Sequence, residues 1–363
     1  MSAIPANDST GWGDTFRSWL LTAHDADGHT TDAITVYDVR GYGATGDGTT
    51  DDTTACQNAL TAAVSAGGGI VYFPPGNYKV TGLSVTLTTT RLKIMGAGQE
   101  STITNAATGS GTTSKCCLYI NAIGNFTTGA NWIEIDDLRL VGNGAAGGAG
   151  VFLDQIPQGR LANIRASGFT NGATYGTGIY MRDCIAVEVA MPVSTENTNG
   201  IVLTGNAQAT NSCQVRGGWL RNNSAYGALL QGGTVRGNSF YGTIFEVNGV
   251  GIYSNGPNVQ GTSIFGGWIE NADTTAHIGI KVNSPGFLAE GVVLVRGLTT
   301  VEVDVGASNV VIRSPYALTN AETMTVQTGA TNVTLWDPTG TITVTDNSGG
   351  QYKKIQSHLL TGG

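Results

Sequence analysis

Two carboxylates, a guanidinium group and two indole rings recur in the middle of the chain at a spacing that could serve sugar chemistry. Three segments each hold a Gly-containing turn followed closely by a charged residue, namely Arg221, Glu246 and Glu270. Trp219 and Trp268 stand two residues before Arg221 and Glu270. If the segments are stacked parallel strands, neighbours lie about 4.8 Å apart, close to the ~5–5.5 Å between the carboxylates of a retaining glycosidase. The pattern predicts a catalytic pair, Glu246 and Glu270, with Arg221 beside it.

Glu196 fits the same column one segment earlier. Glu196 and Glu246 would then lie two strands apart, which approaches the wider separation of an inverting pair. On an outward face, Trp219 and Trp268 could stack on sugar rings. Asp273 is a further candidate for contact with a substrate.

A structural role is open for the same residues. Tryptophan on an inward face is simply core, and Glu and Asn side chains recur as corners where the coils of a repeat protein turn. Asn197, Asn222 and Asn271 would form a ladder of stacked amides under this alignment. Other acids inside the repeats have a weaker claim to catalysis, and these are Asp154, Asp183, Glu188, Asp273 and Glu290.

The elements that must position these residues are visible as a repeat. Six glycines are each followed by a short, mostly apolar run, and successive glycines are 22 to 28 residues apart. A self-similar period of about 25 residues without a helical pattern indicates stacked β-coils, because one copy can bury its apolar face only against the next. The sequence thus predicts a parallel β-helix. The glycines are Gly150, Gly178, Gly200, Gly227, Gly251 and Gly279.

Composition narrows the classes of function. Glycine accounts for 54 of the 363 residues and charged residues for only 12 %, which suits short strands and tight turns. The net charge of −8 disfavours nucleic acid and anionic membranes as partners. We expect no membrane span, because no apolar run reaches roughly 18 residues, and no signal peptide. Five cysteines without CxxC or Cys/His spacing predict free, mostly buried thiols, no metal site and no cofactor.

A helix is expected to begin after Asp52 and to run to about Ala66. Asp51 or Asp52 can cap its N-terminus, and Thr54 with Gln57 fits a capping box. A glycine follows the helix and would stop it. The helix would cover the open end of the solenoid, where a repeat protein needs a lid.

The residues around this helix resemble the pectate-lyase-like right-handed parallel β-helix superfamily, in the branch shared by phage tailspikes and tail fibres. The resemblance rests on Gly43–Thr53, Gln57–Leu60 and Val71–Tyr78, and the later repeats extend it over roughly residues 35–315. It implies an all-β, single-stranded, right-handed parallel β-helix with a short N-terminal capping helix. In this family the motif builds the fold, so its aspartates are expected to be structural.

Three parts follow from this reading. Residues 1–33 form an N-terminal helical arm or linker, with a helix candidate at residues 15–24. Residues 34–315 form the parallel β-helix. Residues 316–363, whose strands have looser spacing, form a C-terminal β cap or a trimerisation region.

The resemblance also implies a function. The chain would be a virion-associated, spike- or fibre-like protein, made in the host cytoplasm, that binds host surface polysaccharide, contacts other virion proteins and forms a homotrimer. One alternative is a polysaccharide depolymerase, either a glycoside hydrolase that uses the paired Glu residues or a calcium-assisted lyase. The lyase is less favoured, because the sequence shows no clear triple of aligned Asp residues. Another alternative is a structural virion component without catalytic activity.

Overall fold

The computed structural model describes residues 35–88, 91–108, 112–122, 131–144, 148–170, 172, 175–270, 277–295, 299–318 and 322–355. Contacts divide the chain into two units, Met1–Val36 and Tyr37–Gly363, and the architecture below is that of the second unit. The helix predicted within residues 15–24 lies outside the described residues, as do Asn271 and Asp273.

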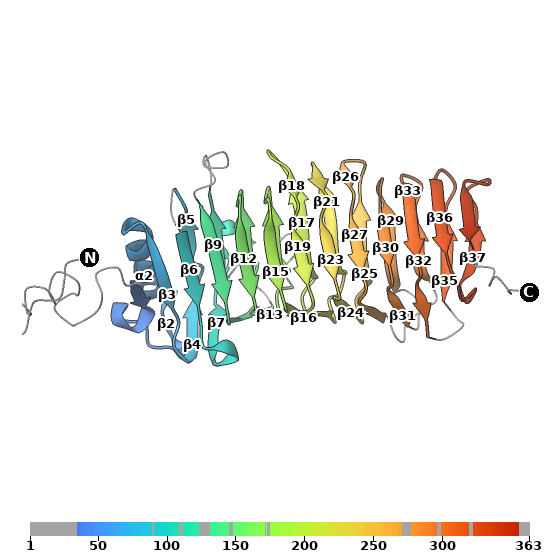
Figure 1. Cartoon of the computed structure of the whole chain (residues 1–363). Helices are drawn as coiled ribbons and strands as arrows, with labels where there is room; N and C mark the ends of the chain where they lie inside the picture. Colours follow the sequence, from blue (N-terminus) through green and yellow to red (C-terminus); the bar gives the residue numbers. More distant parts are fainter. Residues whose placement is uncertain are drawn as a thin grey trace, which may run out of the picture. The chain divides into compact units, whose positions relative to one another are not determined.

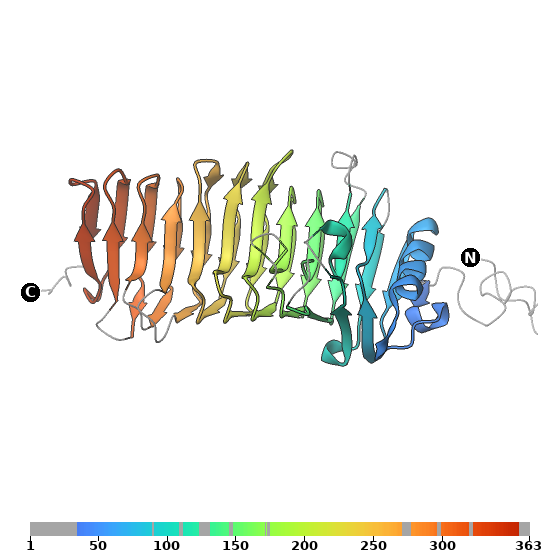
Figure 2. The same cartoon turned by 180° about the vertical axis from the view of Figure 1, so that it is seen from behind.

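Each coil of the second unit contributes strands to three parallel sheets, which we call sheets 1, 2 and 3 in the order in which the chain visits them. The strands of successive coils lie side by side, and the view from behind shows the same order (Figures 1 and 2). The described residues form a β-solenoid of about 10 turns. The predicted all-β, right-handed parallel β-helix is therefore confirmed.

The strands of each sheet have the following bounds. Sheet 1 comprises β1 (Val36–Asp38), β3 (Gly68–Tyr72), β6 (Arg91–Met95), β9 (Trp132–Asp136), β12 (Gly159–Ala162), β15 (Val187–Ala190), β19 (Gln214–Arg216), β23 (Ser239–Tyr241), β27 (Ser263–Phe265), β30 (Leu288–Glu290), β33 (Ser308–Arg313), β36 (Thr331–Trp336) and β38 (Tyr352–Ile355). Sheet 2 comprises β2 (Asp47–Asp51), β4 (Gly76–Val80), β7 (Ser101–Asn105), β10 (Arg139–Val141), β13 (Arg165–Ser167), β16 (Val193–Thr195), β20 (Trp219–Arg221), β24 (Ile244–Glu246), β28 (Trp268–Glu270), β31 (Val293–Val295) and β34 (Tyr316–Ala317). Sheet 3 comprises β5 (Ser84–Thr86), β8 (Leu118–Asn121), β11 (Val151–Asp154), β14 (Thr177–Arg182), β17 (Asn199–Gly205), β21 (Tyr226–Gly232), β25 (Val250–Asn255), β29 (Ile278–Asn283), β32 (Thr299–Val303), β35 (Thr323–Val326) and β37 (Thr343–Asp346). A small sheet comprises β18 (Thr210–Asn211), β22 (Val235–Arg236) and β26 (Val259–Gln260).

Helix α2 (Thr53–Ser65) packs against β3 and β5 at the N-terminal end of the solenoid, as predicted for a capping helix (Figure 1). Asp52 stands at its N-cap, but the side chain makes no capping bond to the helix. The carboxylate accepts instead from the backbone N–H groups of Thr45 (2.6 Å) and Gly46 (3.0 Å), so it ties the preceding loop to the helix. Among the described residues, no helix has the length and apolar character needed to cross a membrane.

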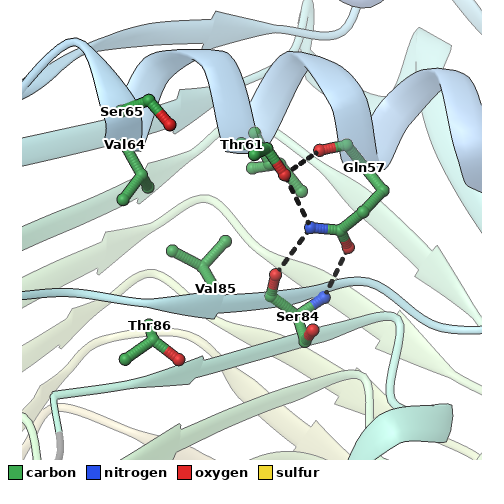
Figure 3. Close-up of a pocket in the computed structure, with 8 residues that line it drawn as sticks. Gln57, Thr61, Val64, Ser65, Ser84, Val85 and Thr86 are labelled. Carbon is green, nitrogen blue, oxygen red and sulfur yellow. Dashed lines mark hydrogen bonds between the residues drawn. The ribbon is translucent and has the colours of Figure 1, made fainter.

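The predicted capping box is wrong, because the Gln57 side chain points to the sheet. Its Oε1 accepts from Ser84 N (3.0 Å) and its Nε2 donates to Ser84 O (2.8 Å), as Figure 3 shows. β5 is the terminal strand of sheet 3, and the side-chain amide stands where another strand would supply a peptide group. The same residues line a shallow pocket of about 180 Å³ between α2 and β5, several coils away from the predicted site.

The short 3-10 helices lie in turns between strands. They span Val39–Tyr42, Gly98–Glu100 and Thr113–Lys115.

Glycine recurs in sheet 3 because the coils approach one another backbone to backbone. A Cβ on Gly200 would lie 2.4 Å from the carbonyl oxygen of Gly227. The same atom on Gly227 or Gly251 would lie 2.5 Å from the carbonyl oxygen of the next glycine, Gly251 or Gly279. A side chain cannot fit at these distances, so the glycine period seen in the sequence follows from coil packing.

A ladder of buried amides runs beside sheet 2. Asn197 Nδ2 donates to Asn223 Oδ1 (3.2 Å), and Asn223 Nδ2 donates to Asn248 Oδ1 (2.9 Å). The prediction placed Asn222 and Asn271 in this ladder; it is wrong for Asn222, and Asn271 lies outside the described residues. Asn222 occupies the preceding corner with φ 53°, a left-handed conformation that Asn tolerates well.

The prediction of free, buried thiols is confirmed for all five cysteines. Burial raises the pKa of Cys56, Cys116 and Cys213 to about 12, so each thiol stays protonated and unreactive in the folded chain. Burial likewise raises the pKa of Cys117 and Cys184.

Architecture changes near the boundary predicted at residue 315, but the solenoid goes on. Sheet 2 ends with β34, whereas sheets 1 and 3 continue in parallel through β38 and β37. Asp337 at the turn after β36 is fully buried and accepts from the N–H groups of Gly340 (2.9 Å) and Ile342 (3.1 Å). After β34, residues 322–355 therefore extend two of the three sheets, while a role in trimerisation stays a prediction.

Candidate functional site

Strand alternation places the predicted site on the outer face of sheet 2. Leu220, Phe245 and Ile269 are the middle residues of β20, β24 and β28, and all three are buried in the core. The flanking residues Trp219 and Arg221 therefore both point outward. No bulge is needed to accommodate them, and the tryptophan is 39 % exposed.

The structure brings together Trp219, Arg221, Glu246, Trp268 and Glu270, which we call the Trp–Glu cluster. Arg221 pairs in register with Glu246, and Glu246 with Glu270. The column predicted for these three residues is thus confirmed as geometry.

Indole N–H groups hold both carboxylates. Trp219 Nε1 donates to Glu246 Oε2 (2.8 Å), and Trp268 Nε1 donates to Glu270 Oε2 (3.0 Å). Arg221 lies over the Trp219 ring, with 5.2 Å between its Cζ and the ring centroid. Its Nε stands 3.6 Å from Glu246 Oε1, which is an ion pair rather than a hydrogen bond. This Nε–H has no hydrogen-bond acceptor among the described residues.

Glu196 does not belong to this column, so its predicted alignment is wrong. Thr195 pairs with Arg221, and Glu196 N donates to Arg221 O (3.3 Å) at the corner that follows. Glu196 has φ 59° and Val247, at the equivalent corner, φ 50°. The Glu196–Glu246 separation expected for an inverting pair therefore has no support from the register.

A second polar cluster lies on the outer face of sheet 3 around Asp154, one of the weaker acid candidates; the sequence did not predict its partners. Arg182 Nε donates to Asp154 Oδ1 (2.9 Å), and its Nη2 donates to Oδ2 (2.6 Å). Tyr119 Oη donates to the same Oδ2 (2.8 Å). We call these residues the Tyr–Asp–Arg cluster. They come from three successive coils, and the register of the parallel strands brings them together, with Asp154 directly opposite Arg182.

Aromatic rings wall this cluster. Phe152 lies 4.5 Å from Tyr180 and 5.4 Å from Tyr119, between ring centroids, and Arg182 lies over its ring at 4.9 Å. Phe152 points outward yet is fully buried, within a hydrophobic cluster separate from the interior core. Burial, together with the hydrogen bond to Asp154, raises the pKa of Tyr119, so its proton stays in place. Both oxygens of the aspartate accept hydrogen bonds, three in all. The cluster therefore reads as a structural part of this face rather than as a free catalytic acid.

The other acid candidates within the described residues have structural partners, whereas Asp273 lies outside them. Glu188 lies in an ion-pair ladder on sheet 1, 3.0 Å from Arg216 and 3.6 Å from Arg160. Asp183 accepts from two backbone N–H groups at a corner, and Glu290 pairs with an arginine of the next coil. Within the described ranges, no group of three or more His, Cys, Asp or Glu side chains is placed to hold a metal ion.

Comparison with known families matches the N-terminal part of the described chain. Residues 36–136 fit the family described as rhamnogalacturonase A/epimerase, pectate lyase-like. Mannuronan C5-epimerase AlgE5 and alginate lyase 7, both from Azotobacter vinelandii, are 56 % and 59 % identical to this chain over 46 residues. That stretch is 13 % of this chain and only 5 % of the length of each relative.

Solved structures share the fold over most of the chain. DFA-IIIase from Arthrobacter chlorophenolicus A6, without its lid, is similar at a TM-score of 0.64 and 13 % identity, over 87 % of this chain and 90 % of that one. The Dettilon tailspike protein is similar at a TM-score of 0.58 and 14 % identity, over 90 % of this chain and 69 % of that one. The A-module of Azotobacter vinelandii mannuronan C-5 epimerase AlgE4 is similar at a TM-score of 0.55 and 16 % identity, over 88 % of this chain and 91 % of that one. The predicted resemblance to pectate-lyase-like β-helices, tailspikes included, is confirmed at the level of fold.

Proposed function

We propose that the chain binds a bacterial surface polysaccharide along the outer face of sheet 2, with the Trp–Glu cluster as the centre of the site. The observation that carries the proposal is the pairing of each carboxylate with an indole N–H, from the exposed Trp219 and the half-buried Trp268. Tryptophan faces stack on the apolar faces of sugar rings, while carboxylates accept from sugar hydroxyls. The cluster offers both kinds of contact at neighbouring coils.

The same column extends the platform. Ile244 lies between the two tryptophans, and Val293 and Tyr316 follow Trp268 in register. Tyr316 is 55 % exposed. Spacings of about 4.8 Å per coil give a straight apolar track on which an extended glycan can lie parallel to the axis of the coils.

The biological setting of the proposal is a phage particle. Support comes from the shared fold of a tailspike and from the polysaccharide-acting enzymes named among the relatives. In this setting the chain is a virion-associated spike or fibre that contacts host polysaccharide and other virion proteins. A homotrimer is expected, and sedimentation at micromolar concentration checks it; a monomer there contradicts it.

A depolymerase is the second candidate, favoured by the in-register stacking of Glu246 on Glu270. One coil step of about 4.8 Å suits the ~5–5.5 Å of a retaining pair. In this second proposal Glu246, beside Arg221, would be the nucleophile that attacks the anomeric carbon, and Glu270 the acid that protonates the leaving oxygen. Water activated by Glu270 would then cleave the glycosyl ester and regenerate Glu246.

Binding is tested by affinity electrophoresis against a panel of capsular and lipopolysaccharide glycans. Trp219→Ala and Trp268→Ala should each weaken binding about threefold to tenfold, the value of one aromatic contact. Trp132→Ala and Trp336→Ala are matched controls, because these tryptophans are similarly exposed (38 % and 40 %) but lie on sheet 1. Equal effects of all four substitutions, or no glycan bound by the unmodified chain, would remove the proposal.

Catalysis is tested separately by release of reducing ends from any glycan that binds. Glu246→Gln and Glu270→Gln should each lower turnover by roughly 10²–10⁴-fold while binding persists. Turnover unchanged in both variants would move the active site elsewhere. Binding without any cleavage by the unmodified chain would leave an adhesin.

A further inference from the structure

Two arginines lie one above the other on the outer face of sheet 2. Arg139 of β10 pairs in register with Arg165 of β13. Leu140 and Ala166, which follow them, are fully buried, so both arginines point outward. Like charges directly opposite one another on a sheet are unfavourable.

Neither guanidinium has a carboxylate within ion-pair distance among the described residues. Arg165 Nη1 donates to Gln99 Oε1, a neutral acceptor, and Arg139 is exposed. The aliphatic part of an arginine side chain can cover apolar surface. This would explain why long side chains stand at these two positions. It does not explain why two positive charges are stacked in a chain of net charge −8.

Several other outward-facing cations of the solenoid lie beside an acid. Arg160 and Arg216 flank Glu188 on sheet 1, and Lys281 lies 3.2 Å from Glu302 on sheet 3. In these ladders an acid of a neighbouring coil neutralises each base. Among the described residues, no acid lies within ion-pair distance of the stacked pair on sheet 2, so the pair can receive an anion from outside the chain.

The pair is continuous with the proposed glycan platform. Arg165 pairs with Val193, and Val193 pairs with Trp219. Arg165 thus lies two coil steps, about 10 Å, from the first tryptophan of the Trp–Glu cluster and in the same column. A polymer stacked on Trp219 and running toward the N-terminal coils would pass over both arginines.

We infer that the polysaccharide bound on this face is anionic, and that Arg139 and Arg165 together form the subsite for its carboxylate or sulfate groups. The inference rests on the proposed function. It names the class of polysaccharide bound and the direction in which the bound polymer runs along the solenoid. Planar guanidinium groups bind such oxyanions through paired N–H donors. Two of them, one coil apart, can engage charged groups of one or two successive sugars.

Three polymers that share one glucan backbone separate charge from shape: carboxymethyl-dextran, dextran sulfate and neutral dextran. Arg139→Gln with Arg165→Gln should weaken binding of at least one charged polymer roughly threefold to tenfold, the modest effect of exposed ionic contacts. Salt should diminish the difference, and binding of neutral dextran should not change. Whether the carboxylated or the sulfated polymer is more affected identifies the anion.

The matched control is Arg91→Gln with Arg236→Gln, which removes the same charge from exposed positions on other sheets. Equal weakening in the control would show a general charge effect and overturn the inference. Unchanged binding of charged polymers in the Arg139/Arg165 variant would also overturn it, while the tryptophan variants would still test the proposed function. If no polymer, these three or the glycan panel, binds the unmodified chain, the proposed function and the inference fail together.

Discussion

Replacing Asn223 with alanine is expected to destabilise the solenoid at its centre. The Asn223 side chain donates to Ser194 O (3.1 Å) and to Asn248 Oδ1 (2.9 Å). It accepts from Asn197 N and from Asn197 Nδ2, both at 3.2 Å. The residue is 1 % exposed, so water cannot replace these bonds without entering the core.

The magnitude follows from which groups lose a partner. Asn197 Nδ2 keeps bonds to Ser194 Oγ (3.0 Å) and Ala166 O (3.2 Å), and Asn248 Oδ1 keeps the backbone N–H of Asn223 (3.1 Å). The backbone N–H of Asn197 loses its acceptor. One orphaned buried donor and three further lost bonds amount to about 3–6 kcal/mol, a large part of the stability of a typical domain.

Chemical denaturation monitored by tryptophan fluorescence measures the effect, with hydrogen exchange to locate it, because repeat proteins need not unfold in one step. Asn222→Gly is the matched control: it removes the neighbouring amide at a left-handed corner that glycine accepts, and should change the free energy of unfolding by less than about 0.5 kcal/mol. A value for Asn223→Ala within that same range would refute the account of the ladder.

Three further predictions follow from contacts outside the ladder. Gly200→Ala should destabilise the chain in a melting experiment, because its Cβ would meet the carbonyl oxygen of the next coil, whereas Gly41→Ala, with open space around its Cβ, should not. Gln57→Ala should cost about 1–2 kcal/mol and speed amide exchange at Ser84, whose N–H loses its acceptor; unaltered exchange would contradict this role. Burial alone would raise the pKa of Asp337, but hydrogen bonds from two backbone N–H groups and a threonine hydroxyl, together with a lysine charge, hold it below the ordinary 3.8. The stability that its ionised form contributes is therefore present above about pH 4 and lost as the pH falls further. Asp337→Asn should lower the free energy of unfolding at pH 7, and lower it less at pH 3. The same loss at both pH values would contradict this account.

The repeat was predictable because every coil meets the same packing constraint. A backbone contact that only glycine permits leaves a period in the sequence, and the Arg221–Glu246–Glu270 column follows once the Gly-rich turns are aligned. Aligning the coils by their glycine-rich turns fails at Glu196, because that coil has Met191 rather than a glycine at the left-handed turn position. Met191 has φ 51°, against 61° for Gly217 in the next coil. Without a glycine at that position, the sequence gives no sign of the turn.

The Tyr–Asp–Arg cluster could not be predicted from the same signal. Tyr119 and Asp154 are 35 residues apart and Asp154 and Arg182 are 28 apart, because loops lengthen some coils and not others. Register alone brings them together, and register is fixed by the packed core. The stacked Arg139 and Arg165, 26 residues apart, were hidden for the same reason.

The five buried thiols give the molecule a set of internal probes. They lie on the capping helix, immediately before β8 and at corners before β15 and β19. An alkylating reagent can reach each sulfur only when its own coil opens, and the raised pKa values slow reaction in the closed state. Labelling rates compared along the chain would thus show whether neighbouring coils open together or one at a time.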